Sequence, residues 1–180
     1  MKKKSLLLSF CVLCLVIFVS GCGNGSIKYH EPNKEVGNIK YYVPNDYKYR
    51  EDLRGLFYSD DNRKVYAKGD TTDYSSFYYI DMIKVSSNNQ KLKDYMESIN
   101  TKNLKENDVK FIKFDNKNME VYERAGYVTK KGDVEIVNYA YIIQIDDDYF
   151  YGLTISGPKS NQKEVEETAK SSAYSLQKVQ

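Results

Sequence analysis

The sequence predicts an α+β domain built on a mainly antiparallel sheet with two amphipathic helices. Short runs of β-branched and aromatic residues alternate with turn sequences along most of the chain, as in antiparallel sheets. Two segments, residues 92–99 and 165–176, instead repeat apolar residues at helical spacing. Residues 134–145 are largely apolar on both strand faces, which is typical of a central strand covered on two sides. The domain is therefore expected to be a sandwich of sheet and helices.

The first part of the domain is expected to contain short strands followed by a helix. The expected strands are residues 39–44, 56–59, 64–67 and 77–85. Turns rich in Asp and Asn, such as residues 60–62, separate them. Ser and Asn at positions 87–89 then supply helix N-cap chemistry. The helix that follows is predicted from apolar residues on one face: Leu92, Tyr95, Met96 and Ile99.

The second part of the domain is expected to be a strand meander closed by a helix. The expected strands are residues 109–114, 119–129, 134–145 and 149–156. Gly157-Pro158 is expected to end the last strand. Asn161 with Glu164 fits a capping box in which Asn is the cap. The closing helix is predicted from one apolar stripe: Val165, Ala169, Ala173 and Leu176.

The strand expected at residues 134–145 decides how the domain is layered. One of its faces carries Val137, Tyr139, Tyr141, Ile143 and Ile145. The opposite face carries Ile136, Ala140 and Ile142. Because both faces must be removed from water, we expect the two helices to cover them.

The start of the chain has the layout of an export signal. Three lysines precede an apolar stretch over residues 6–19, and small residues follow in the run Ser20-Gly21-Cys22. The apolar stretch is shorter than the ~20 residues that a membrane-spanning helix needs, which argues against an uncleaved anchor. The run resembles a bacterial lipobox. That resemblance implies cleavage between Gly21 and Cys22, a diacylglyceryl group on Cys22, and a lipid-anchored protein on the extracytoplasmic face of the cell membrane.

The chain is accordingly expected to have three parts. Residues 1–21 are the lipoprotein signal peptide, residues 22–36 are the lipidated cysteine with a flexible tether, and residues 37–180 are a single α+β domain. The remaining cysteines, Cys11 and Cys14, fall within the signal, so the exported domain has no thiol for a disulfide or a metal site.

The charge balance gives no sign of a nucleic-acid partner. The chain has 27 Lys and Arg and 25 Asp and Glu, and removal of the signal's three lysines leaves 24 basic against 25 acidic residues. Nucleic-acid binding requires a clustered basic surface on a basic domain. We therefore expect the membrane, reached through Cys22, and an envelope protein as partners.

No catalytic or metal-binding pattern stands out. His30 is the only histidine and lies in the expected tether, where a general base would lack a rigid scaffold; we interpret it as an exposed linker residue. The acidic turns at residues 60–62 and 146–148 offer oxygen ligands for calcium, but neither matches an EF-hand, and Asp and Asn also suit tight turns. Neither a metal nor a cofactor is expected.

Tyrosine is the most unusual component, with 18 residues in a chain that has no tryptophan. A tyrosine-rich face could grip a saccharide or a protein, because the ring is apolar and the hydroxyl polar. High β-propensity offers the simpler explanation that these residues build the sheet, which we favour. The tyrosines on expected strands are Tyr41, Tyr42, Tyr78, Tyr79, Tyr139, Tyr141, Tyr149 and Tyr151.

The order of elements, from the Ile-Lys-Tyr-Tyr-Val-Pro opening to the Tyr-Phe-Tyr-Gly-Leu-Thr-Ile strand at 149–155 and the closing helix, resembles the PsbP-like and DcrB-like α/β sandwich of small bacterial lipoproteins. The resemblance implies a mostly non-catalytic accessory or binding module. We therefore expect a lipid-anchored surface protein that is not an enzyme and that binds another envelope component. The alternative is a lipoprotein that binds a small ligand or ion for a transport system.

Overall fold

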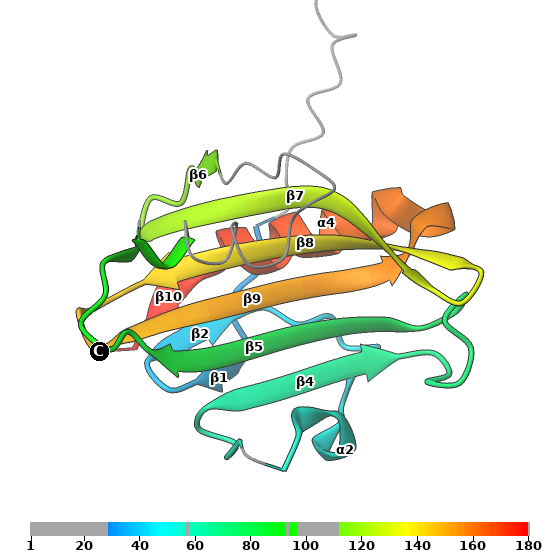
Figure 1. The fold of residues 1–180 in the computed structure, drawn as a ribbon, viewed down its shortest axis with the longest axis horizontal. Helices are drawn as coiled ribbons and strands as arrows, with labels where there is room; N and C mark the ends of the chain where they lie inside the picture. Colours follow the sequence, from blue (N-terminus) through cyan, green and yellow to red (C-terminus); the bar gives the residue numbers. More distant parts are fainter. Residues whose placement is uncertain (1–28, 57, 93, 97–111, 180) are drawn as a thin grey trace, which may run out of the picture.

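The computed structural model describes residues 29–56, 58–92, 94–96 and 112–179. They form an α+β sandwich, as the sequence predicts. A seven-stranded sheet runs through the molecule, and a helix and a three-stranded sheet lie behind it in the view of Figure 1. Every pairing between neighbouring strands is antiparallel.

The large sheet places its longest strands at the centre and its shortest at the edges. In spatial order its strands are β3 (Lys48–Tyr49), β4 (Arg63–Lys68), β5 (Tyr78–Ser86), β9 (Tyr149–Pro158), β8 (Val134–Gln144), β7 (Glu120–Lys131) and β6 (Ile112–Phe114). The tight turn between β7 and β8 contains Gly132 at φ +60°, a left-handed conformation that glycine adopts without steric cost. Between β8 and β9, the Asp146 carboxylate accepts the backbone N–H groups of Asp148 and Tyr149.

The small sheet and the C-terminal helix form the second layer. The sheet consists of β1 (Lys34–Val36), β2 (Ile39–Tyr41) and β10 (Gln177–Lys178), with β2 in the middle. A 3-10 turn, η1 (Lys159–Asn161), leads into α4 (Gln162–Tyr174). The short helix α2 (Glu51–Arg54) lies beyond β4 (Figure 1).

Two serines, one in α4 and one just after it, connect the end of this helix to Tyr42, the residue that follows β2. The Ser172 hydroxyl donates to the carbonyl oxygen of Tyr42 at 2.8 Å, and the Tyr42 N–H donates to the Ser175 hydroxyl at 2.7 Å. Both serines are buried, so these bonds satisfy polar groups that would otherwise be costly in the core.

The main core lies between the large sheet and the second layer. The expected stripe faces it, because Val165, Ala169 and Ala173 of α4 are buried there; Leu176 is buried there too, although it follows the helix, which ends at Tyr174 and not at residue 176 as expected. Much of the remaining volume is filled by tyrosine rings. The buried tyrosines of this core are Tyr41, Tyr47, Tyr66, Tyr78, Tyr139, Tyr141 and Tyr151.

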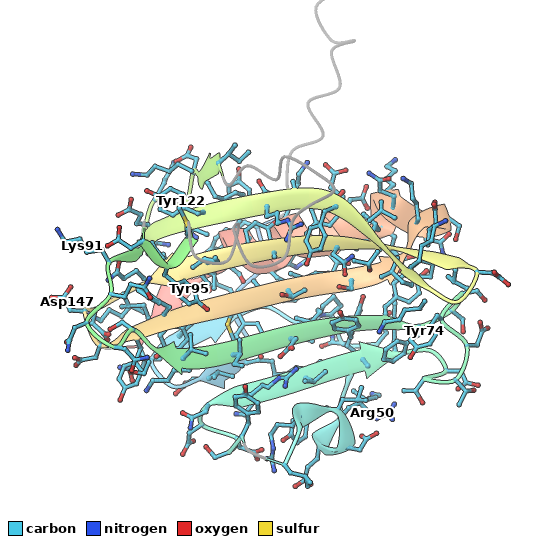
Figure 2. All side chains as sticks on the ribbon, viewed as in Figure 1. Arg50, Tyr74, Lys91, Tyr95, Tyr122 and Asp147 are labelled. Atoms are coloured by element: carbon cyan, nitrogen blue, oxygen red, sulfur yellow. The ribbon has the colours of Figure 1, made fainter. Side chains whose placement is uncertain are left out.

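A smaller core lies on the opposite face of the large sheet. Leu92 and residues 94–96 are helical, as predicted, and Leu92 packs with the buried Ile142 and Phe150. Ile99, the last residue of the predicted face, lies outside the described residues. Tyr95 and Tyr122 join this cluster on the face turned toward the viewer in Figure 2. The face of β8 toward α4 is thus buried in the main core, and the opposite face is covered where Leu92 packs on Ile142, whereas Ala140 on that opposite face is partly exposed. The prediction that both faces of β8 are covered is therefore confirmed only in part.

The loop before β4 corrects one sequence prediction. Residues 56–59 were expected to be a strand, but Leu56, Tyr58 and Ser59 form turn and irregular structure, and Leu56 is 100% exposed. The segment follows Gly55, whose φ of +87° ends α2, and Tyr58 N–H turns back to the Gly55 carbonyl. A short apolar run has no strand identity unless a neighbour pairs with it.

Two further sequence predictions are wrong at the junction between β9 and α4. β9 extends beyond Ser156 through Gly157 to Pro158, where it still pairs with β8 although its pairing with β5 ends at Ser156. A proline is tolerated at such a half-paired strand end. The capping box is also wrong. The Asn161 side chain makes no cap hydrogen bond; its amide donates to the Tyr78 hydroxyl instead, and Glu164 pairs with Lys68.

Candidate functional site

The structure describes the N-terminal part of the chain from Tyr29 onward. Gly21 and Cys22 lie outside the described residues. Tyr29 is the first described residue, and its hydroxyl accepts a hydrogen bond from the Gln177 side chain at 3.0 Å. The His30 ring stacks on the Tyr42 ring, with 4.2 Å between centroids and 10° between planes. The interpretation of His30 as a free linker residue is therefore wrong.

The domain also begins earlier than residue 37. The Asn33 side chain bridges both backbone groups of Val43, accepting its N–H at 2.9 Å and donating to its carbonyl at 2.8 Å. Residues 34–36, expected in the tether, form β1. In sequence, polar residues without periodicity resemble a linker. Here, polar side chains such as that of Asn33 instead hold the segment against the domain.

The most distinctive polar surface is the face of the large sheet opposite α4, here named the outer face. The strand registers place its central residues in two neighbouring rows. Across β7, β8, β9, β5 and β4, the first row reads Arg124, Ala140, Thr154, Asp81 and Val65. In the same order, the second row reads Tyr127, Asn138, Ser156, Tyr79 and Ala67.

A buried hydrogen-bond network fixes the second row. The Ser156 hydroxyl, which is fully buried, donates to the Asn138 side-chain oxygen at 2.7 Å. The Asn138 amide donates in turn to the Thr129 hydroxyl at 3.1 Å and the Tyr127 carbonyl at 3.2 Å. Burial raises the pKa of Tyr79 and of Tyr127, so both phenols are neutral at physiological pH.

An ion pair holds Asp81, which lies near one end of the first row. The Arg63 guanidinium donates two hydrogen bonds to the Asp81 carboxylate, at 3.0 and 2.7 Å, and a third to the Arg54 carbonyl. Both partners are partly buried, and the two-pronged geometry is the strong form of this pair. Asp81 is therefore already occupied by a cation.

Arg124, at the other end of the first row, has no such partner. Its guanidinium lies over the Tyr127 ring, 3.8 Å from the centroid. Among the residues that the structure describes it forms no ion pair or hydrogen bond, and its Nε is buried without an acceptor. Burial lowers the pKa of Arg124, because desolvation disfavours its positive charge, and the neighbouring Tyr127 phenol opposes this shift only in part.

A β-bulge produces this placement. The β7–β8 register shifts between Arg124 and Tyr127, and Gly126 adopts φ +62° within the shift. Without the extra residue, side chains three positions apart on a strand would point to opposite faces. The bulge thus brings Arg124 and Tyr127 to the same side.

Small, partly exposed residues lie between these groups. Ala140 and Thr154 occupy the middle of the first row, and Gly152 lies next to them along β9. The tyrosine pair of the second row borders them on one side and the cluster around Leu92 on the other. The outer face therefore presents a floor of small side chains with aromatic borders and one uncompensated cation.

The acidic turns serve local structure. Asp60 accepts hydrogen bonds from Tyr49 and Arg54, and Asp146 caps its own turn. Within the described part of the chain, no three His, Cys, Asp or Glu side chains are grouped as a metal site would need.

The tyrosines are mainly structural, as favoured. Tyr41, Tyr78, Tyr139, Tyr141 and Tyr151 are buried in the main core. Tyr149 is at the surface, where the Lys84 ammonium lies 3.8 Å from its ring centroid.

Sequence reasoning missed Arg124 and Tyr127, although the Ala125-Gly126 step inside an expected strand was a usable signal of a bulge. Among the described residues, no helix is long and apolar enough to cross a bilayer.

Comparison with known proteins shows the fold alone. No family model and no curated protein matches the chain. A crystal structure from Bacteroides thetaiotaomicron VPI-5482 is similar with a TM-score of 0.54 and 10% identity, over 85% of this chain and 50% of that one. LpqN of Mycobacterium tuberculosis, described as involved in cell envelope biogenesis, has a TM-score of 0.52 and 13% identity, over 79% of this chain and 83% of its own. This chain thus spans about half of the Bacteroides protein, and both neighbours are bacterial.

Proposed function

We propose that this chain is a lipid-anchored protein of the bacterial cell envelope that acts on the extracytoplasmic side by binding rather than by catalysis. The observation that carries the proposal is the run ending in Gly21-Cys22, placed after a basic, apolar leader and before a folded domain. The fold shared with LpqN, a protein described as involved in cell envelope biogenesis, supports an envelope role.

The geometry supports binding through the outer face. His30, the chain's only histidine, stacks on Tyr42, whose carbonyl accepts a hydrogen bond from Ser172 of α4, so it lies on the side of the large sheet away from the outer face. The outer face itself offers aromatic borders, small residues and a cation, which suit recognition of a partner. The partner we favour is another envelope component; a small ligand passed to a transport system is the second candidate, and the uncompensated Arg124 favours it.

Lipid attachment is testable with variants inside the leader region. Cells expressing the full chain are fed an alkyne fatty acid, and the protein is captured through the alkyne. Cys22→Ala is expected to abolish labelling and to leave the protein unprocessed or released from the membrane fraction. Cys14→Ala, which removes another thiol of the same segment, is the matched control and is expected to label normally. Equal labelling and retention of both variants would refute the anchor.

The partner class is tested by crosslinking intact cells that carry the tagged chain and identifying attached proteins by mass spectrometry. A specific envelope protein, captured above the level of an unrelated lipid-anchored control and lost when Tyr79 and Tyr127 are changed, is the expected result. Capture of no protein above the control would exclude a stable protein partner and favour the small-ligand candidate.

A further inference from the structure

The arginines of this chain differ in how their charge is compensated. They are Arg50, Arg54, Arg63 and Arg124. Arg50 pairs with Asp52, Arg54 pairs with Asp60, and Arg63 pairs with Asp81.

Of these four arginines, only Arg124 has no carboxylate partner among the described residues. It is nevertheless partly buried, where leaving a cation without an anion is unfavourable. A partly buried, planar donor group with no internal acceptor has the chemistry of a binding group rather than of a fold-stabilising pair.

The surroundings keep Arg124 in place without neutralising it. The Tyr127 ring supports the guanidinium through a cation–π contact, which fixes its plane; the Nε is buried, so the two Nη groups are the donors left for a ligand. Tyr127 belongs in turn to the buried network of Asn138 and Ser156, through its own carbonyl. The nearest anion along the same row, Asp81, is three strands away, or about 14 Å at the usual strand spacing, and it is bonded to Arg63.

We propose that Arg124 and the adjoining floor of Ala140 and Thr154 form a binding site for a ligand that carries an oxyanion, a carboxylate or a phosphate. The guanidinium donates paired hydrogen bonds to the oxyanion, since its fork matches both groups. The rest of the ligand lies over the small residues between Arg124 and the paired Asp81, where Tyr79 supplies an aromatic wall. The Thr154 hydroxyl is placed to bond its polar substituents. This inference deepens the second candidate of the proposed function, a ligand held by the outer face, and it rests on the premise that the outer face binds.

The test is calorimetric titration of the purified full chain in a non-ionic detergent. Three probes are used: inorganic phosphate, acetate, and mixed micelles containing either phosphatidylcholine or phosphatidylglycerol. We expect saturable binding of at least one oxyanion, weakened at least tenfold in Arg124→Gln. Arg124→Lys keeps the charge but loses the fork, so it is expected to bind with intermediate affinity. Arg50→Gln is the matched control, because it removes the same charge from a surface pair beyond β4 (Figure 2) and is expected to bind as the unmutated chain does.

The arms separate the sources of the oxyanion. Binding of free phosphate or acetate that depends on Arg124 supports a soluble ligand. Binding only of phosphatidylglycerol micelles that depends on Arg124 supports the same site with a lipid headgroup. Equal binding by Arg124→Gln and Arg50→Gln, or no binding in any arm, overturns the proposal.

A second readout needs no substitution. In the unmutated chain, an arginine-selective dicarbonyl reagent is expected to modify Arg124 faster than the paired Arg63, and the bound oxyanion is expected to slow only the reaction at Arg124. Peptide mass mapping measures both rates. Modification of Arg124 that the oxyanion does not slow contradicts the site. Failure of lipid labelling at Cys22 would leave these binding results unchanged, so the two proposals fail separately.

Discussion

The hydroxyl of Tyr141 lies 3.0 Å from the Glu123 carboxylate and donates a hydrogen bond to it inside the core beneath α4. Glu123 is buried, so water does not reach its carboxylate, and the Tyr141 hydroxyl supplies the hydrogen-bond donor instead. Burial, reinforced by the negative Glu123, raises the pKa of Tyr141 far above its usual value and keeps the phenol protonated.

Tyr141→Phe is therefore expected to destabilise the fold by about 1–3 kcal/mol, the usual cost of leaving a buried polar group without its partner. Tyr122→Phe is the matched control, because Tyr122 donates to Glu120 at 2.8 Å in the same chemistry but at an exposed position. Urea unfolding of both variants measures the difference. Similar losses in the two variants would mean that burial of the Glu123 pair adds nothing.

Gly69 and Gly132 both have a positive φ, but we expect substitution by alanine to cost very different amounts of stability at the two positions. A Cβ at Gly69, where φ is +83°, would overlap the Ser76 carbonyl oxygen, whereas a Cβ at Gly132, where φ is +60°, has no atom within 4 Å. Gly132→Ala is expected to cost about 1–2 kcal/mol from the left-handed backbone alone. Gly69→Ala also forces the backbone of the β4–β5 connection apart, so it is expected to cost more or to prevent folding, as judged by urea unfolding and circular dichroism. An equal cost at both positions would contradict the steric account.

The tyrosine-rich core predicts unfolding in alkali. Burial raises the pKa of Tyr66 from 10.0 to about 12, and burial also raises the pKa of Tyr41 well above its usual value. In the unfolded chain these phenols lose protons above pH 10, while the folded chain retains them, so the unfolded state binds fewer protons. Their contribution to stability is complete below pH 10 and is lost as the pH rises through 12. Circular dichroism and tyrosinate absorbance should change together; gradual ionisation of the folded protein would contradict this.

Tyr41 offers a specific variant for that experiment. Its hydroxyl is buried and, among the described residues, has no hydrogen-bond partner. Tyr41→Phe removes an unsatisfied polar atom and retains the ring, so it is expected to leave stability at neutral pH unchanged or to increase it by up to about 1 kcal/mol. It should also move alkaline unfolding to higher pH. A clear loss of stability at neutral pH would show that the hydroxyl is satisfied in solution.

The contacts of Asn33 predict that the chain is fixed before β1. Asn33→Ala removes both bonds to Val43 and leaves its backbone groups without those partners. We expect faster amide hydrogen exchange at Val43 and around β1 and β2, with little change in β8 and β9. Glu31→Ala, an exposed substitution two residues earlier, is the control. Unchanged exchange in Asn33→Ala would mean that strand pairing alone holds this segment.

Alternation and helical spacing were sufficient to predict the long elements. β5, β7, β8 and β9 carry enough apolar residues to define a period, and α4 carries a stripe that the main core buries. β1 and β10 have three and two residues and no period of their own. They are strands because β2 pairs with both, which is a tertiary property.

The outer-face site was beyond prediction for a similar reason. In sequence, Arg124 resembles any solvated charge on a strand. Its significance comes from a register that places Asp81 three strands away and from a bulge that adds Tyr127 to the same face. The sequence does indicate the bulge at Gly126, but it does not show which arginine side chains form ion pairs with carboxylates.

Docking of the chain at Tyr29 limits how far the domain can rise from a bilayer. With the anchor proposed at Cys22, about seven residues separate the lipid from the first contact with Gln177, and these span at most about 25 Å when fully extended. That height is less than the thickness of one bilayer. With the proposed anchor, the domain would therefore stay close to the lipid headgroups. It would contact molecules at the membrane surface, and more distant targets would be out of its reach.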